Sequence, residues 1–327
     1  MPALVSTGGK QAGARGERLA RSRVSDIQRA RMLHAMAEVA AERGAANATV
    51  AHVVARSGVS RRTFYDLFED REDCFMAAFE EALEKVSRRA AAAYGLVGRW
   101  QVRVRGALTA VLEFIEEEPD QGRLLVVESL VAGPRAMARR ERVLEVLLAA
   151  IEEGRRQGRP AQDPSALSAE GLVGAVLSVI HARLVHRETD SLAELVNPLM
   201  SMIVLPYLGP AAAKREAERP VAKSSRRLRA RRRDPLRDLD MRLTYRTVRV
   251  LIAISSDPGA SNRKVADTAG VSDQGQISKL LLRLQNLGLI ENTGDGPAKG
   301  EPNAWQLTAK GHEVEQTIRE QTAAGES

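Results

Sequence analysis

Three short helical segments separated by tight turns, near the start of the chain, constrain its fold more than any other feature. Apolar residues recur every three or four positions from Asp26 to Arg43, which predicts an amphipathic helix that ends at Gly44. Thr49 can cap a short second helix, Gly58 supplies a tight turn, and Ser60 can cap a third helix. This spacing predicts a helix-turn-helix, a module that binds DNA.

The third of these segments divides its side chains between a core face and a free face. Phe64 and Phe68 fall on the core face, whereas Arg61, Arg62 and Tyr65 face solvent or a major groove. Two adjacent arginines suit the O6 and N7 acceptors of guanine. We therefore expect this segment to read base edges.

The stretch from Thr49 to Phe75 resembles the DNA-binding signature of the TetR family of bacterial regulators. The positions that match are Thr49, Gly58, Val59, Ser60, Thr63, Phe64, Tyr65 and Phe68. The resemblance implies that the third segment enters the major groove, that Thr49 and Tyr65 contact phosphates, and that the following helix anchors its N-terminus on the DNA backbone. Arg71 replaces the usual lysine and can still pair with phosphate, while Arg62 replaces a common small glycine. The residues expected to contact DNA are Thr49, Ser60, Arg61, Arg62, Thr63, Tyr65 and Arg71.

Residues 71–208 read as about six helices separated by glycine, proline and polar breakers. The last two predicted helices, 171–187 and 191–208, are apolar; Val176 and Leu199 are typical of their stripes. The family resemblance implies that these helices form the four-helix interface of a homodimer. The alternative is that both are internal core.

A pocket for a small-molecule effector is implied by the resemblance alone. Tyr94, Trp100 and Phe114 are aromatic candidates to line it, and each is also explained as ordinary core. Glu128 and His181 lie in apolar helical runs, where a polar group needs a partner. Either contacts a ligand or makes a structural hydrogen bond.

Positive charge gathers at two places outside the predicted domains. The first 31 residues hold seven Lys or Arg against two acids, and Arg226–Arg233 holds six arginines in eight positions. We expect a basic disordered arm over 1–22 and an arginine-rich linker over 209–240. The arginine run either contacts nucleic acid or is a soluble spacer.

A second DNA-reading domain is predicted from Met241 onward. Three helical segments are followed by a glycine- and proline-rich loop between two short apolar stretches, which predicts a β-hairpin wing. Ser272 can cap the third helix, which runs to about Leu287 with a polar stripe opposite its leucines. The DNA-contact candidates are Ser272, Gln274, Gln276, Lys279, Arg283 and, in the hairpin, Lys299. The stretches 264–272, 287–290 and 307–311 resemble MarR-type winged helices. Zero net charge over 241–327 also permits a protein-docking module.

The composition favours helices, because aromatic residues make up only 3% of the chain. We expect an all-α, TetR-like helical bundle with an N-terminal helix-turn-helix (23–70), a helical regulatory and dimerisation domain (71–208), and a small winged helix with a β-hairpin (241–324). Cys74 is the single cysteine, so a reducing compartment and a cytoplasmic protein are expected, without a signal peptide or membrane span.

No phosphate-binding loop, metal-ligand spacing or nucleophile motif is visible, which predicts no enzyme, no cofactor and no metal. The predicted function is sequence-specific transcription regulation, as a repressor, by a homodimer bound to double-stranded DNA. An architectural protein that bridges DNA is the alternative, and its low specificity ratio would distinguish it.

Overall fold

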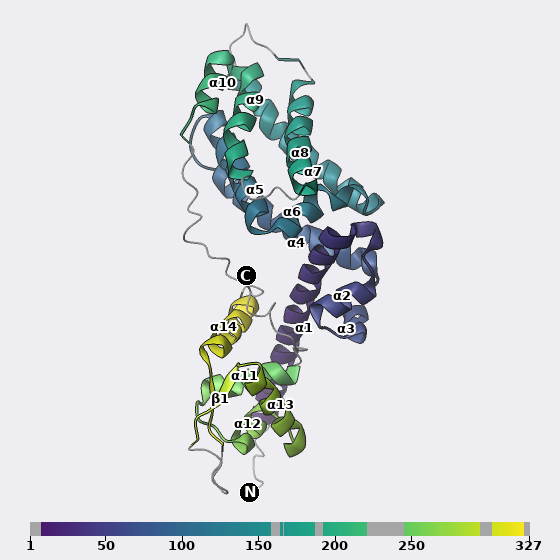
Figure 1. Ribbon diagram of the computed structural model, residues 1–327, viewed down its shortest axis with the longest axis vertical. Coiled ribbons are helices and arrows are strands. Elements are labelled where there is room, and N and C mark those ends of the chain that lie inside the picture. The colour runs from purple at the N-terminus through teal and green to yellow at the C-terminus, as the bar shows by residue number, and fades with distance from the viewer. Residues whose placement is uncertain are drawn as a thin grey trace, which may run out of the picture. The chain divides into compact units, whose positions relative to one another are not determined.

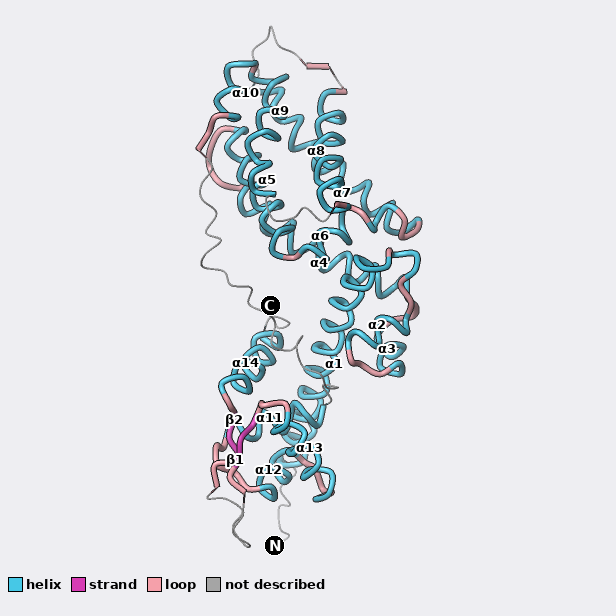
Figure 2. Tube along the Cα trace, viewed as in Figure 1, coloured by secondary structure: helices cyan, strands magenta, loops and turns pink. Residues whose placement is uncertain are grey.

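The computed structural model describes residues 8–157, 164–165, 167–186, 192–220, 245–294 and 303–323. The chain forms two compact units, and each is taken by itself. One comprises residues 33–56 and 64–231 and contains the helical body; the other comprises residues 1–32, 57–63 and 232–327 and contains the C-terminal domain. Helices dominate both units (Figure 1). In the described part, strands occur as one short pair in the C-terminal domain (Figure 2).

The first helix is longer than the sequence predicts. Helix α1 spans Gly8–Arg43, so residues 8–22 are helical where a disordered arm was expected. Alanine, arginine, glutamine and glutamate are strong helix formers, and extending an existing helix costs far less than starting one. Gly44 ends the helix with a positive φ of 84°, a backbone conformation that glycine adopts without strain.

The predicted helix-turn-helix is present. After a single 3₁₀ turn, η1 (Ala45–Asn47), helix α2 spans Val50–Ser57 and helix α3 spans Arg61–Leu67. Gly58, with φ of 65°, provides the turn between them. The predicted turn is confirmed. It could be predicted because its sequence signal depends on a few adjacent residues.

The helical body contains six α-helices in its described residues between 71 and 208, as the breakers predict. They are α4 (Arg71–Tyr94), α5 (Trp100–Glu117), α6 (Pro119–Val126), α7 (Pro134–Glu152), α8 (Ser168–Val185) and α9 (Val196–Leu208), with 3₁₀ turns η2 (Glu128–Leu130), η3 (Glu153–Gln157) and η5 (Leu192–Leu195). Helix α4 packs on α5, α5 on α9, and α6 and α7 on α8. Fully buried Leu112, Leu124, Met200 and Tyr207 lie in this core.

A further helix, α10 (Pro210–Ala217), stands where the sequence predicts the start of a linker. Ala212 and Ala213 are buried, and α10 packs along α9. Arg105 on α5 donates hydrogen bonds to Glu216 (2.8 Å) and to Asn197 on α9 (2.8 Å). These long-range contacts fix α10 to the body, so the linker assignment was wrong for residues 210–217. The arginine run Arg226–Arg233 lies outside the described residues.

In its described residues, the C-terminal domain has three helices, a hairpin and a fourth helix. They are α11 (Tyr245–Ser256), α12 (Asn262–Ala269), α13 (Gln274–Asn286), β1 (Ile290–Asn292), β2 (Trp305–Leu307) and α14 (Ala309–Ala323). The strands are antiparallel, with Ile290 opposite Leu307. Both are only three residues long, so the winged-helix assignment remains a proposal.

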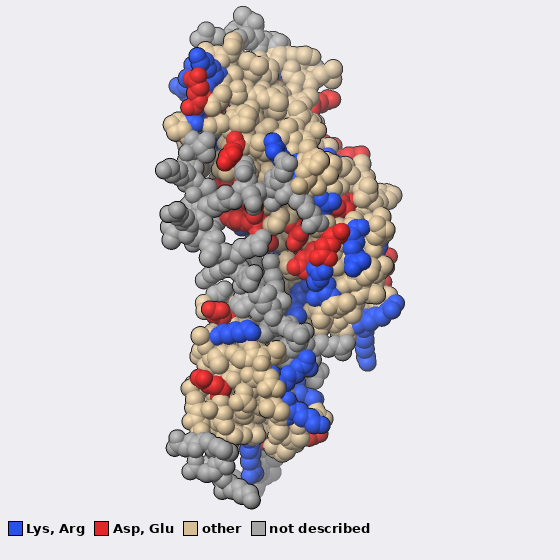
Figure 3. Space-filling model, viewed as in Figure 1, with Lys and Arg blue, Asp and Glu red and all other residues tan. Residues whose placement is uncertain are grey.

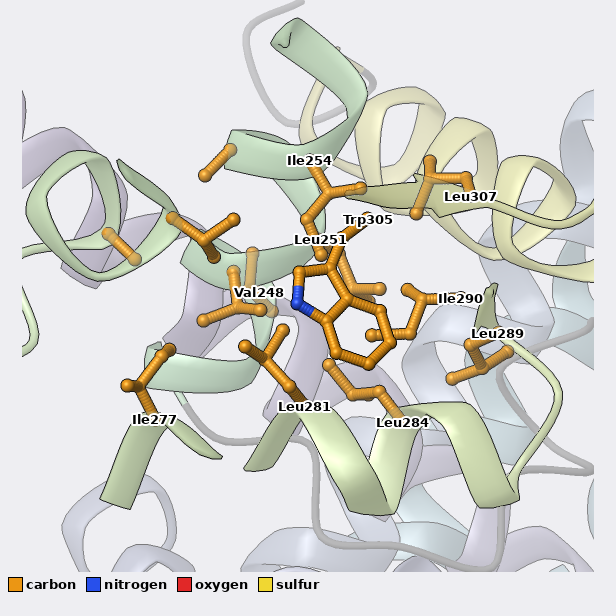
Figure 4. Close-up of a cluster of buried hydrophobic side chains, with 14 of the residues drawn as sticks. Val248, Leu251, Ile254, Ile277, Leu281, Leu284, Leu289, Ile290, Trp305 and Leu307 are labelled. Atoms are coloured by element: carbon orange, nitrogen blue, oxygen red, sulfur yellow. The ribbon is translucent and has the colours of Figure 1, made fainter. Parts of the chain in front are cut away.

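Trp305 is at the centre of this domain's core. Its indole lies among Val248, Leu251, Leu281 and Leu284, as Figure 4 shows. Side chains from α11, α13 and the hairpin thus share one buried cluster. The cluster fixes the base of the hairpin against the helices.

The start of α14 approaches the hairpin so closely that only glycine fits there. A Cβ atom on Gly311 would lie 1.9 Å from the carbonyl oxygen of Leu289. The backbone N–H of Thr308 donates to the same oxygen (3.1 Å). Any side chain at residue 311 would therefore push α14 away from the hairpin.

Candidate nucleic-acid interface

Helix α3 is held by a hydrogen-bonded N-terminus and a buried aromatic face. The backbone N–H of Thr63 donates to the Ser60 hydroxyl (3.0 Å), and the two hydroxyls lie 2.8 Å apart. Phe64 is fully buried and meets the ring of Tyr65 edge-on, with centroids 5.4 Å apart. The Ser60 hydroxyl therefore caps the helix, as predicted.

The opposite face of α3 is open to solvent. Arg61 and Arg62 are exposed, and half of the Tyr65 side chain is accessible. Blue side chains, the colour of Lys and Arg, project from the surface near α2 and α3 in Figure 3, and the Lys and Arg positions of these two helices are all arginines. The three predicted base- and phosphate-reading residues thus share one exposed, cationic surface.

Thr49 and Arg71 have structural partners at either side of the helix-turn-helix. The Thr49 hydroxyl accepts a hydrogen bond from the backbone N–H of His52 (3.3 Å) and starts α2. The guanidinium of Arg71 donates to the carbonyl oxygens of Ala45 (2.5 Å) and Ala48 (3.4 Å). Arg71 therefore fixes the η1 turn to α4, a role that the sequence does not reveal, and its contact with phosphate stays a prediction.

An ion-pair cluster that the sequence analysis missed ties α2 to α1. Arg56 pairs with Glu42 (2.6 Å) and with Glu38 (3.4 Å). A hydrogen bond from His34 is the main cause that lowers the pKa of Glu38, and Arg56 lowers it further. The cluster orients the helix that precedes α3.

The N-terminus of α13 is capped by Asp273, one residue after the predicted cap Ser272. Its carboxylate accepts from the backbone N–H groups of Gly275 (2.8 Å) and Gln276 (3.1 Å), and the bond from Gln276 is the largest cause of its lowered pKa. Ser272 is exposed. Both residues suit a cap, and sequence pattern does not separate adjacent candidates.

The predicted polar stripe of α13 is exposed. It comprises Ser272, Gln276, Lys279, Arg283 and Asn286, and the further DNA-contact candidate Gln274 is exposed as well. Arg246 on α11, missed by sequence reasoning, donates to the Gln276 amide oxygen and adds a cation beside it. Leu282 is also 58% exposed on this helix. Lys299 lies outside the described residues.

A chain of asparagine amides holds the base of the hairpin. The Asn262 amide oxygen, at the start of α12, accepts from the Trp305 indole N–H (2.5 Å) and from Asn303 (3.1 Å). Asn292 in turn donates to Asn303 (2.8 Å). The hairpin is thereby tied to the helix that precedes α13.

The aromatic ligand candidates have structural partners. The Tyr94 hydroxyl donates to Glu153 (2.5 Å), and burial followed by this hydrogen bond raises the pKa of Tyr94 to about 12. The Trp100 indole donates to the carbonyl oxygen of Ala150 (2.8 Å). Phe114 is buried. These residues support the core of the body.

Glu128 makes the structural hydrogen bonds that the sequence analysis offered as one alternative. Its carboxylate, 3% exposed, accepts from the backbone N–H of Ala45 (2.8 Å) and from Arg123 (3.1 Å). The Arg123 guanidinium also donates to the carbonyl oxygen of Leu184 (3.0 Å). Glu128 thus connects the end of α1 with α6 and α8.

His181 lines a cavity of about 500 Å³ between α6, η2, α7 and α8. Its apolar lining is Val126, Leu130, Leu144, Leu148, Val173, Gly174 and Leu177, and its polar lining is Arg140, Glu170, Ser178 and His181. The part of the chain that the structure describes contains no group of three metal-binding side chains.

Comparisons with known proteins agree with the helix-turn-helix geometry. Residues 32–78 match the family described as bacterial regulatory proteins, tetR family. The chain is 27% identical over 124 residues to the HTH-type transcriptional activator FasR of Mycolicibacterium smegmatis. The alignment covers 38% of this chain and 55% of that protein. The chain thus spans about half the length of this curated relative.

Two solved structures are also similar to part of the chain. The fatty acid degradation regulator FadR from Bacillus halodurans is 17% identical, with a TM-score of 0.49, and the alignment covers 54% of this chain and 94% of that one. A TetR-like transcriptional regulator from Rhodococcus sp. RHA1 is 21% identical, with a TM-score of 0.44 and the same two coverages. Residues 32–78, which match the description of the tetR family of bacterial regulatory proteins, include the helix-turn-helix formed by α2 and α3.

Proposed function

We propose that this protein is a sequence-specific, DNA-binding transcription regulator that reads the major groove with α3. The observation that carries the proposal is the capped α3 helix, which buries Phe64 while it exposes Arg61 and Arg62. Adjacent exposed guanidinium groups on a short, fixed helix suit bidentate contacts with guanine. The family match over the same residues supports this reading.

The test is the affinity for a DNA site selected from random double-stranded sequences with the full chain. Replacing Arg61 and Arg62 by alanine should cost about 1–3 kcal/mol for each arginine that reads a base. Tyr65→Phe should weaken binding to selected and scrambled DNA alike, because a phosphate contact carries no sequence information.

Arg88→Ala is a suitable control for the loss of charge. Arg88 is 71% exposed on α4 and pairs only weakly with Glu84 (3.8 Å). Equal DNA affinity of the double arginine variant and of this control would refute the reading by α3. A selected-to-scrambled affinity ratio near one would instead favour the DNA-bridging function.

We further propose that the protein acts as a homodimer through α8 and α9. Helix α8 is long and apolar enough to cross a membrane by length and composition, yet only 22% of it is buried in the protomer. Gly171 on α8 has open space around the position of a Cβ atom. Leu205 on α9 is 48% exposed. A second copy that packs on this face would cover the apolar surface.

Leu205→Asp is the substitution that tests the dimer, because its side chain is accessible in one protomer. Leu199, which the sequence offers as an interface residue, is 4% exposed within the protomer, so its replacement would unfold the body instead. Light scattering should give a dimer for the wild-type chain and a monomer for Leu205→Asp. A wild-type monomer at micromolar concentration would contradict the dimer.

The C-terminal domain is proposed as a second DNA reader of the winged-helix type. The exposed stripe of α13, the added cation Arg246 and the tied hairpin support it. Replacing Lys279 and Arg283 by alanine should then shorten the footprint of the full chain on its selected site. Affinity should fall as well, because a tethered second reader raises the local concentration.

Protein docking is the second candidate function of this domain, and the exposed Leu282 favours it. An accessible leucine on the polar face of α13 fits an apolar contact with a protein partner. An unchanged footprint in the Lys279 and Arg283 double variant would support docking over DNA reading.

A further inference from the structure

The core of the C-terminal domain holds the first turn of α11 near the first turn of α13. Val248 on α11 and Ile277 on α13 belong to one buried cluster, and their side chains are 4% and 0% exposed (Figure 4). Arg246 and Gln276 stand shortly before them in the chain, and both are exposed. The packing of the core therefore brings these two polar side chains together at the surface.

The side-chain amide of Gln276 is bonded at both of its ends. Its oxygen accepts a hydrogen bond from the Arg246 guanidinium. The backbone N–H of Gln276 is the largest cause of the lowered pKa of Asp273, and the Gln276 side chain adds a further hydrogen bond to that carboxylate. Only the amide nitrogen can donate to a carboxylate, so the amide has one orientation, with its oxygen toward Arg246 and its nitrogen toward Asp273.

This orientation conflicts with the base-reading role that the sequence suggests for Gln276. Recognition of adenine in the major groove uses both ends of a glutamine amide, because N6–H needs the amide oxygen and N7 needs the amide nitrogen. Each end of Gln276 is already bonded to a charged group, and such bonds are stronger than neutral ones. Contact with adenine would compete with both bonds. Gln276 is therefore placed to hold Arg246.

The charge of the Arg246 guanidinium is not neutralised by this bond. Its acceptor is a neutral amide, whereas Lys264 on α12 is paired with the carboxylate of Asp257 (2.7 Å). An arginine has several N–H donors in a planar fork. A guanidinium that is held at one end presents the other donors in a fixed direction, which suits a planar pair of acceptors such as O6 and N7 of guanine.

We propose that Arg246 reads guanine for the C-terminal domain and that Gln276 is its positioning residue. Arg246 reaches the N-terminal turn of α13, and in helix-turn-helix proteins the N-terminal residues of the reading helix contact base edges. This assignment rests on the proposed second DNA reader. It adds the base and the pair of residues that give that reader its sequence preference.

The experiment measures base preference with the full chain. A site is selected from random duplexes, and the part of its footprint that depends on Lys279 and Arg283 is located with the double alanine variant. Each base pair of that part is then replaced in turn. Arg246→Ala should reduce the preference for one G·C pair from about 10- to 100-fold to near one, which is the discrimination of a bidentate contact. Gln276→Ala should reduce the preference at the same pair, and the double variant should lose no more than Arg246→Ala.

Gln276→Glu separates positioning from adenine reading. Glutamate is favourable in the first turn of a helix, and its carboxylate still accepts from Arg246. This variant should keep the preference for the G·C pair. An amide that reads adenine would instead lose its preference for an A·T pair in both Gln276→Ala and Gln276→Glu.

Two exposed residues of the same domain provide matched controls. Arg263→Ala on α12 removes an equal charge, and Gln285→Ala on α13 removes an equal amide. Both variants should keep the preference at the G·C pair. A merely structural role of Gln276 would lower the affinity for selected and scrambled DNA alike and leave the base preference unchanged.

The outcomes separate this assignment from the proposal on which it rests. If Arg246→Ala weakens binding to all duplexes equally, as a lost phosphate contact does, or if Gln276→Ala relaxes an A·T pair, the roles of Arg246 and Gln276 are wrong and the second reader stands. If the Lys279 and Arg283 double variant leaves the footprint unchanged, the second reader is refuted, and the assignment is refuted with it.

Discussion

Replacing Glu128 by alanine should weaken the junction between the helix-turn-helix and the rest of the body. The substitution leaves the buried N–H of Ala45 without an acceptor and removes the ion-pair partner of Arg123. Removing one member of a buried pair costs about 3–5 kcal/mol. The Arg123 side chain is 22% exposed and keeps its bond to Leu184, so the cost should be near the lower end, about 3 kcal/mol.

The chain has two units, so one global unfolding transition would not report this junction cleanly. Hydrogen exchange of the Ala45 amide is the appropriate measurement. A loss of about 3 kcal/mol predicts exchange roughly 100-fold faster than in the wild-type chain, since each 1.4 kcal/mol is a factor of ten.

Glu80→Ala provides the matched control for this measurement. Its side chain is 45% exposed and pairs with the 29% exposed Arg139, so its loss should cost less than about 1 kcal/mol. If exchange at Ala45 is no faster in Glu128→Ala than in Glu80→Ala, Glu128 does not hold the junction.

Two other outcomes follow from local geometry and are measurable by thermal or acid unfolding. Gly311→Ala should destabilise the C-terminal domain by at least about 2 kcal/mol, because its Cβ would collide with the Leu289 carbonyl. Gly174→Ala on α8, where the space is open, should not destabilise the protein. Equal melting temperatures of the two variants would contradict this prediction. The pKa of Glu38 is lowered from 4.5, mainly by the hydrogen bond from His34. Its contribution to stability, less than about 1 kcal/mol, should therefore be complete above pH 4.5 and be lost as the pH falls through the lowered pKa of the folded state. Glu38→Gln should therefore flatten the acid side of the stability profile, and an unchanged profile would refute the assignment.

Local signals in the sequence were enough to predict the helix-turn-helix. Caps and turns depend on residues a few positions apart, so Gly44, Gly58 and Ser60 indicate the boundaries of α1, α2 and α3 directly. The same locality leaves adjacent candidates unresolved, which is why Asp273 rather than Ser272 caps α13. Serine and aspartate are about equally favourable as helix N-cap residues.

Features that depend on distant contacts could not be predicted. Helix α10 has an ordinary Ala- and Lys-containing sequence, and its stability depends on Arg105, more than a hundred residues earlier in the chain. The cavity likewise combines side chains from three helices, and His181 alone of the five ligand candidates lines it. Arg140 was missed because its place in the cavity wall becomes visible only when the neighbouring helices are in place.

The positions of the two tryptophans make the protein its own optical probe. The chain contains two tryptophans; Trp100 is fully buried in the helical body and Trp305 is 5% exposed in the C-terminal domain. Each indole donates a hydrogen bond inside its own unit, to Ala150 and to Asn262. The emission of a Trp305→Phe chain therefore arises from the body, and that of a Trp100→Phe chain from the C-terminal domain. Unfolding of each unit, and its response to DNA, can be followed separately by intrinsic fluorescence without an added dye.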